Sequence, residues 1–112
     1  MDKLTFHQQQ VLTFLHMYKE DYRQDPGDID TQVIADLEGH HYLLLRVGWK
    51  QGRFYHYCLF HFDLKDDKVW IQQNNTETLV GDELVALGIA KENIVLGFKP
   101  EAMRQHTGFG VG

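Results

Sequence analysis

The sequence predicts an α+β domain in which a long N-terminal helix packs on a four-stranded antiparallel meander sheet, followed by short helices and a candidate short fifth strand. Apolar residues recur at helical spacing over residues 4–22. Four stretches typical of β-strands then lie between residues 29 and 73, separated by short turns. No linker, repeat or low-complexity tract interrupts the 112 residues, so we expect a single domain over residues 1–112.

The first helix is expected over residues 4–22, because its apolar side chains form one stripe at spacings of three, four and seven. The segment Asp25-Pro26-Gly27 is expected to end it, since proline cannot continue a helix and glycine suits a turn. The stripe consists of Leu4, Val11, Leu15, Tyr18 and Tyr22.

The strands are expected over residues 29–37, 42–49, 54–62 and 68–73. Apolar and polar residues alternate in the first of them, as in a strand with one buried face. Short turns at residues 38–40, 50–52 and 64–67 connect the four, and turns of this length join neighbouring antiparallel strands.

The third strand indicates how the sheet is covered. A strand with one face in water should alternate apolar and polar residues, and this strand is apolar on both faces. We therefore expect a helix of this chain on one face, and more of the chain or a second copy on the other. The even positions hold Phe54, His56, Cys58, Phe60 and Phe62, and the odd positions hold Tyr55, Tyr57, Leu59 and His61.

Short elements are expected after the sheet. Helical spacing returns over residues 78–87, and Gly88 ends that helix. The apolar run 94–98 forms either a fifth strand or buried extended chain. Pro100 then begins a short helix over residues 101–106, and residues 107–112 are expected to be a flexible tail with Phe109 as an aromatic anchor.

Composition argues against several functions. The net charge is −5 and the 11 Lys and Arg residues are scattered, which disfavours direct nucleic-acid binding. The single cysteine, Cys58, permits no intrachain disulfide and no Cys-x-x-Cys metal site. Neither a signal peptide nor a membrane span is recognisable, so a cytoplasmic protein is expected.

The seven histidines do not predict a metal site. His56 and His61 are five apart on one strand, and alternation should point them to opposite faces. His40 and His41 are adjacent at a turn and should diverge. The aspartates at 63, 66 and 67 crowd a turn, but without the spacing of a calcium loop. We therefore expect no metal ion and no cofactor.

No residue is predicted to be catalytic, although one hydrolytic alternative stays open. His61 and Asp63 share a strand face, and a carboxylate can orient an imidazole as a general base. A metal-dependent nuclease would need Asp36, Asp63 and Lys65 to converge with His61. Their spacing follows no recognisable motif.

Aromatic residues of the sheet suggest a surface for a partner. Core packing is their first interpretation, a protein–protein interface the second, and base stacking the third. Base stacking would need nearby basic residues, for which Arg46, Lys50, Arg53 and Lys68 are the candidates. The candidate partner surface comprises Tyr42, Trp49, Tyr55, Tyr57, Trp70 and Gln72.

Taken together, several segments resemble the XisI family, small proteins named as controlling factors for excision of the fdxN DNA element in cyanobacteria. The resemblance runs along the whole chain, and its most specific parts are Lys68-Val69-Trp70-Ile71-Gln72 and the ending Thr107-Gly108-Phe109. Asp67 departs from the family, whose turn would carry glycine. The other matching segments are Gly27-Asp28, Val47-Gly48-Trp49, Phe62-Asp63-Leu64-Lys65-Asp66, Asn74, Thr76-Glu77, Glu83-Leu84, Gly88-Ile89 and residues 93–98 with Pro100.

The resemblance implies an accessory protein rather than an enzyme. An XisI protein acts alongside a recombinase and a companion, XisH, that resembles nucleases, and the family supplies no catalytic motif. We therefore predict a non-catalytic regulator of site-specific DNA element excision that binds an XisH-like companion or the recombinase and forms a homodimer. The alternatives are a small metal-dependent nuclease or hydrolase, and a weak direct nucleic-acid binder.

Overall fold

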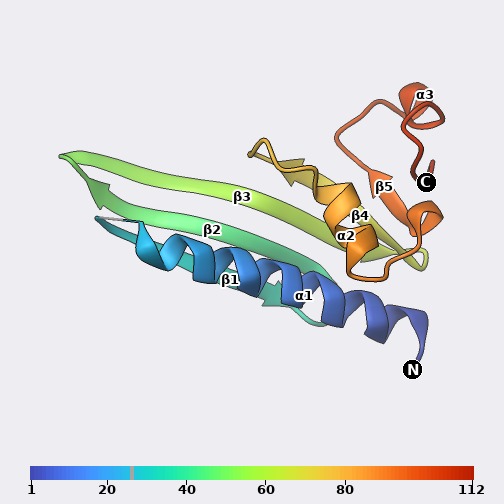
Figure 1. The fold of residues 1–112 in the computed structure, drawn as a ribbon, viewed down its shortest axis with the longest axis horizontal. Helices are drawn as coiled ribbons and strands as arrows, with labels where there is room; N and C mark the ends of the chain where they lie inside the picture. The colour runs from blue at the N-terminus through green and yellow to red at the C-terminus, as the bar shows by residue number, and fades with distance from the viewer. Residues whose placement is uncertain (26) are drawn as a thin grey trace.

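The computed structural model describes residues 1–25 and 27–112, and it has the predicted α+β architecture with two helices on one face of a twisted open sheet (Figure 1). The predicted helix breaker Pro26 lies outside the described residues. Several bounds differ from the prediction by a few residues. In chain order the elements are α1 (Lys3–Asp21), the 3-10 turn η1 (Tyr22–Gln24), β1 (Asp28–Asp36), β2 (His41–Lys50), β3 (Arg53–Lys65), β4 (Lys68–Asn74), α2 (Val80–Ala86), the 3-10 turn η2 (Lys91–Asn93), β5 (Ile94–Leu96) and α3 (Glu101–Arg104).

Helix α1 begins at a side-chain cap and buries one stripe. The Asp2 carboxylate accepts a hydrogen bond of 2.7 Å from the Thr5 N–H, which satisfies one of the free donors of the first turn. Val11, Phe14 and Leu15 are buried from water. His7 is buried as well, although its residue type predicts a surface position.

The sheet has the order β1-β2-β3-β4-β5. The first four strands form the predicted antiparallel meander, and the apolar run after residue 93 adds β5 parallel to β4. Two hairpins close with two-residue turns in which Gln51, Gly52, Asp66 and Asp67 all have positive φ. Aspartate is among the residues that adopt this conformation readily, so the turn forms although Asp67 is not glycine.

A bulge in β3 changes which side chains share a face. Cys58 pairs with Leu45 but Phe60 pairs with Leu44, so Leu59 is an extra residue and the alternation shifts by one. Tyr55 and Tyr57 therefore share a face with Phe60 and Phe62. The prediction that even and odd positions form two constant faces was wrong, because a bulge is set by pairing with the neighbouring strand.

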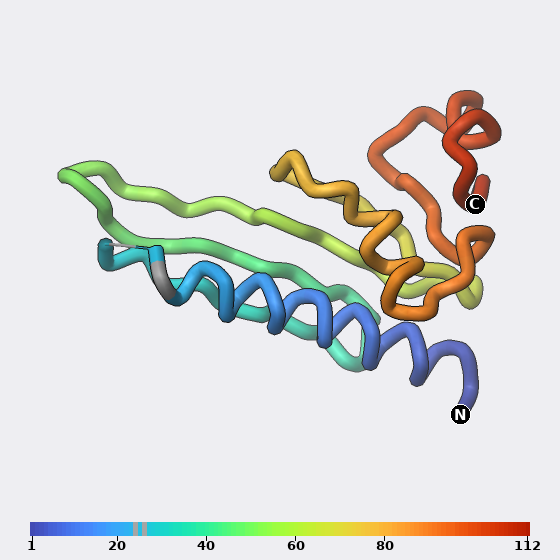
Figure 2. The backbone as a smooth tube through the Cα atoms, viewed as in Figure 1, coloured from blue at the N-terminus to red at the C-terminus, as the bar shows by residue number. Residues whose placement is uncertain are grey.

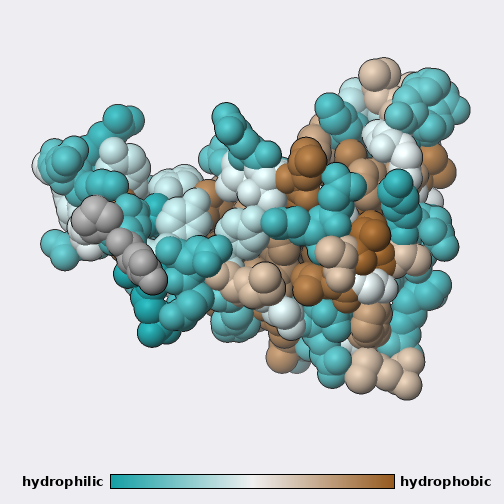
Figure 3. Space-filling view, in the orientation of Figure 1, coloured by the Kyte–Doolittle hydropathy of each residue, from teal (hydrophilic) through white to brown (hydrophobic). Residues whose placement is uncertain are grey.

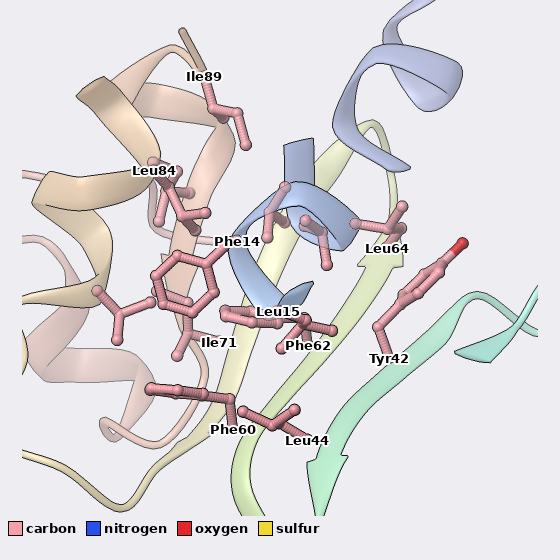
Figure 4. Packing of buried hydrophobic residues seen from close by; sticks show 14 of the residues in the cluster. Phe14, Leu15, Tyr42, Leu44, Phe60, Phe62, Leu64, Ile71, Leu84 and Ile89 are labelled. Atoms are coloured by element: carbon pink, nitrogen blue, oxygen red, sulfur yellow. The ribbon is translucent and has the colours of Figure 1, made fainter. Parts of the chain in front are cut away.

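Helices α1 and α2 both pack on the face that carries these aromatics. The Phe14 ring of α1 packs edge-on against Phe60 and Phe62, with ring centroids 5.0 and 5.5 Å apart. Helix α2 adds Val80 and Leu84 to the same cluster (Figure 4). Neither α1 nor α2 covers the opposite face of the sheet, which we call the open face (Figures 1 and 2). Among the helices of the described residues, α3 reaches this face at one end, where Arg104 lies over the Trp70 ring.

Buried Arg46 joins the end of α1 to the sheet. Its guanidinium donates to the Asp25 carboxylate at 2.7 Å and to the Tyr57 hydroxyl at 3.2 Å. The guanidinium carbon also lies 4.3 Å from the centre of the Tyr22 ring. These contacts compensate for the cost of burying a charge and hold Tyr22 and Asp25 against the sheet.

The segment after β5 is docked rather than flexible. The Gly110 N–H donates to the Ile94 carbonyl at 2.6 Å, and Gly110 also bridges to Val95. The Phe109 ring lies against Gly81 of α2, where an added Cβ would come within 2.6 Å of it. The expectation of a flexible tail was wrong, because backbone pairing with β5 supplements the aromatic anchor.

We predict that Phe14→Ala destabilises the fold by about 3–5 kcal/mol, because the deletion leaves a cavity between two buried rings. Met17→Ala is the matched control in the same helix, since Met17 is exposed and its truncation should cost less than about 0.5 kcal/mol. Urea denaturation followed by circular dichroism measures both. If both variants lowered the free energy of unfolding by the same amount, the packing described for α1 would be contradicted.

Candidate functional site

The structure distributes the six predicted partner-surface residues over different environments. Tyr42 is fully buried beneath α1 and is therefore not part of any surface. Tyr55 and Tyr57 lie on the helix-covered face, where Tyr57 accepts the hydrogen bond from Arg46. Trp49 lies on the open face and is 59% exposed. The six residues do not form one continuous patch, and the shift caused by the bulge is one reason.

Trp70 lies on the open face but is covered by the chain itself. Lys65 Nζ lies 4.0 Å from the centre of its ring, and the Arg104 guanidinium carbon lies 5.1 Å from it. Only 9% of Trp70 is exposed, so its ring is not available for a flat partner such as a base. Gln72 donates instead to the Asp63 carboxylate, at 3.1 Å.

Apolar side chains extend along the open face from Leu43 to the β2–β3 hairpin turn, where two aromatic rings are the most exposed of them. Trp49 and Phe54 are directly opposite each other on β2 and β3, their ring centroids lie 5.2 Å apart, and Phe54 is 51% exposed. Ile34 of β1 is also exposed. Partly buried apolar residues of β2 and β3 lie between Ile34 and the pair Trp49–Phe54. We call the set the open-face patch; its members are Ile34, Leu43, Leu45, Val47, Trp49, Phe54 and Cys58.

The helix-covered face has a different distribution of side chains. In Figure 3 its hydrophobic side chains gather around α2, β4 and β5, whereas the arm formed by the β2–β3 hairpin is largely hydrophilic. The aromatic open-face patch on that arm is therefore a feature of one side of the sheet.

A free strand edge adjoins the open-face patch. Strand β3 has 13 residues, but β4 pairs only with Phe60 to Lys65. Figures 1 and 2 show the β2–β3 hairpin extending well past the end of β4. In an antiparallel pair, every second residue turns its backbone N–H and C=O groups away from the neighbouring strand. Starting from the turn at Gln51 and Gly52, the β3 residues that point away from β2 are Phe54, His56 and Cys58. We call residues 53–58 the β3 edge.

Polar residues cluster at the other end of the open face. His41 Nδ1 lies 2.6 Å and His61 Nε2 lies 2.8 Å from the same oxygen, Oδ1 of Asp63. The second carboxylate oxygen accepts the hydrogen bond from Gln72. Because a carboxylate only accepts, both imidazole nitrogens carry their proton on the atom that points at Asp63. We call His41, His61 and Asp63 the His–Asp cluster.

The bulge and the strand pairing together create this cluster. His41 is directly opposite Asp63 in the register of β2 and β3, and His61 precedes Asp63 by two residues on the same face. Sequence reasoning paired His61 with Asp63 correctly but missed His41, which only the strand register identifies. The expectation that His56 and His61 face opposite sides was also wrong, because one extra residue lies between them.

Electrostatic contacts shift two pKa values within the His–Asp cluster. The hydrogen bond from His41 to Asp63, together with the negative charge, raises the pKa of His41 above its ordinary value. Burial acts to raise the pKa of Asp63, but hydrogen bonds from His41, Gln72 and His61 outweigh it and leave that pKa below its ordinary value. An orienting carboxylate beside an imidazole is thus present, as a general base needs.

The full set of residues considered for a nuclease does not converge. Asp63 and His61 meet, but Lys65 lies over the Trp70 ring. The Asp36 carboxylate accepts backbone hydrogen bonds from Glu38 and Gly39 and stabilises their turn. Asp66 and Asp67 form a separate turn. The described side chains thus assemble two of the four predicted groups.

The basic residues considered for nucleic-acid binding are engaged within the chain. Arg46 and Lys50 both contact Asp25, at 2.7 and 3.4 Å. Lys68 donates to the Gly112 carbonyl at 2.6 Å, and the Arg53 guanidinium carbon lies 5.3 Å from the centre of the Tyr55 ring. They form no basic surface beside Trp49.

Comparisons with known proteins agree on one family. The family model described as XisI protein matches residues 1–111. The fold is similar to that of a XisI-like protein from Anabaena variabilis, with 38% identity and a TM-score of 0.84 over 96% of this chain and 99% of that one. It is also similar to the fdxN element excision controlling factor XisI from Anabaena variabilis, with 25% identity and a TM-score of 0.83 over 99% and 100% of the two chains.

No curated protein matches the sequence. Among the helices of residues 1–25 and 27–112, none has the length and apolar character that crossing a membrane requires.

We predict that the pKa of His41 lies above that of an unperturbed histidine and falls in the Asp63→Asn variant, because the amide carries no charge to stabilise the imidazolium. NMR titration of the imidazole resonances measures both values. His16 on the outer side of α1 serves as an internal reference. An unchanged His41 titration in the variant would contradict the hydrogen bond between these strands.

Proposed function

This chain belongs to the XisI family, and we propose that it is a non-catalytic accessory protein that controls site-specific excision of a DNA element by binding another protein. The match covers residues 1–111, and a solved relative that matches over its full length is described as an excision controlling factor. A regulator of this kind needs a recognition surface rather than a nucleophile.

The open-face patch is the observation that carries the proposal. Trp49 and Phe54 pack against each other with tilted rings, and more than half of each residue is exposed to water. Aromatic residues in partly desolvated positions dominate the binding energy of protein interfaces. Aliphatic neighbours on β1 and β2 extend the patch along the sheet, which is typical of an interaction site rather than of scattered surface residues.

The charge of the chain supports a protein partner over DNA. The net charge is −5, and the basic residues nearest the aromatic pair, Lys50 and Arg53, contact Asp25 and the Tyr55 ring within the chain. We propose that the patch binds the XisH-like companion that the family resemblance implies, in the cytoplasm where bacterial DNA is rearranged. The companion, or the recombinase, would then supply contacts to DNA.

The β3 edge supports self-association as a second part of the proposal. Unpaired N–H and C=O groups on a long strand favour pairing with another strand. Residues 53–58 carry one charged side chain and no proline, and nothing in that sequence prevents such pairing. We propose that two copies pair antiparallel along this edge, which joins their sheets into one and brings their open-face patches together.

The hydrolytic alternative retains one supporting observation. The His–Asp cluster contains an oriented imidazole, as a general base requires. Because Lys65 and Asp36 are engaged elsewhere, we place the cluster outside the proposed regulatory function.

We predict that Trp49→Ser weakens binding of the XisH-like companion by at least about 30-fold, the loss expected for a central aromatic of an interface. Met17→Ser is the matched control, because Met17 has similar exposure but lies on the outer side of α1. Calorimetry with the two purified proteins measures the affinities. If Trp49→Ser bound the companion as tightly as the unsubstituted protein does, the companion would have to bind outside the open-face patch. A loss of affinity in Met17→Ser would contradict the proposal in the same way.

We predict that His56→Pro converts the proposed dimer to a monomer while the fold remains intact. Proline lacks the backbone N–H that in His56 points away from β2. A free strand edge tolerates this loss, whereas an edge paired with a second copy loses a hydrogen bond. His56→Ala is the control that removes the side chain and keeps the backbone donor. Light scattering after size exclusion measures the mass. A monomeric unsubstituted protein, or a dimeric His56→Pro variant, would refute edge pairing.

A further inference from the structure

We propose that His41, His61 and Asp63 bind a divalent transition-metal ion of the Zn²⁺ type. The inference starts from the positions of three donor atoms. One nitrogen of each imidazole and one oxygen of the carboxylate lie within 4.8 Å of one another. Both imidazoles approach Oδ1 of Asp63, and their rings are almost perpendicular, at 79°. The strands therefore bring two nitrogen donors and one oxygen donor close enough together to bind one small cation.

The separations between the donor atoms suit a small cation. Nitrogen and oxygen ligands lie about 2.0–2.2 Å from Zn²⁺, so neighbouring donors of a tetrahedral site are roughly 3.3–3.5 Å apart. The two imidazole nitrogens are 2.6 and 2.8 Å from the carboxylate oxygen, so each donor must move outward by a fraction of an ångström. The His41 side chain is half exposed and can make that movement.

The metal would replace the two protons that now bridge these atoms. Each imidazole loses the proton on the nitrogen that faces Asp63, either to its other ring nitrogen or to water, and that nitrogen becomes a ligand. The Asp63 carboxylate needs no such change, since it is already ionised when it accepts two hydrogen bonds. No oxidation or reduction is involved.

The surrounding strands hold the donors in place. His61 and Asp63 are on β3 and His41 is opposite Asp63 on β2, so hydrogen-bonded backbone fixes the relative positions of all three. Gln72 of β4 donates to the second carboxylate oxygen and orients it. Partners of this kind raise the metal affinity of the ligands that they orient.

The donor set selects the class of metal. Two imidazoles and one carboxylate suit Zn²⁺ and related divalent transition metals, whereas Mg²⁺ and Ca²⁺ prefer oxygen donors throughout. Three protein ligands leave at least one position open, and the exposure of His41 places that position at the surface. Water or a donor from a bound partner would complete the coordination.

Calorimetric titration of chelator-treated protein, without a histidine tag, tests the site with ZnCl₂. We expect one Zn²⁺ per chain, and an affinity at least about tenfold weaker in His61→Ala and in Asp63→Ala. His56→Ala is the matched control, because His56 lies on the same face of β3 but outside the His–Asp cluster. Circular dichroism establishes whether each variant is folded.

NMR of the unsubstituted protein keeps the test decisive even where a variant fails to fold. Zn²⁺ should shift the imidazole resonances of His41 and His61 and leave those of the other histidines unchanged. The proposal is overturned by absence of saturable binding, by shifts at other histidines only, or by unchanged affinity in both ligand variants. Loss of binding in His56→Ala alone would overturn it as well.

Discussion

Packing of the helices on a single face of the sheet is the constraint on which the rest of this structure depends. A helix is about 10 Å wide and strands lie roughly 4.8 Å apart, so one helix covers about two strands. Helix α1 covers the region where Phe14 meets Phe60 and Phe62, and α2 extends the cover over β4. Among the described elements, the short helix α3 reaches the open face only at Trp70, far from the β2–β3 hairpin turn. The aromatic pair Trp49–Phe54 is consequently left in water.

Local patterns predicted the elements well because each depends on neighbouring residues. The apolar stripe of α1, the turns at 51–52 and 66–67 and the run that forms β5 could all be recognised from spacing and composition. The second helix begins later than predicted, at Val80, because Asn74 and Thr76 hold the preceding residues in a hydrogen-bonded turn. These side chains bind backbone groups that a helix would otherwise use, and the spacing of apolar residues does not reveal such hydrogen bonds.

Features that depend on pairing between strands were not predictable in the same way. One extra residue, Leu59, reverses the faces of half of β3. This reversal places Tyr55 and Tyr57 on the helix-covered face and His56 on the same face as His61. The His–Asp cluster needs the register that sets His41 opposite Asp63, and no spacing along the chain encodes that register. The burial of Trp70 likewise needs Arg104, which reaches it from a later segment. Of the residues in the sequence-based surface, Trp49 is therefore exposed and stays a candidate, whereas Tyr42 is buried.

The two proposed sites are centred at opposite ends of the open face, although Leu43 of the open-face patch is directly opposite His61. His41 and Trp49 lie at opposite ends of β2, and at about 3.3 Å per residue they are roughly 26 Å apart. A partner seated on Trp49 and Phe54 covers the arm of the hairpin, where the β3 edge is also free. It can leave the His–Asp cluster exposed at the other end, next to the segment that covers Trp70. Metal binding and partner binding can therefore occur together on one side of the sheet, and each can be removed by substitutions that leave the other intact.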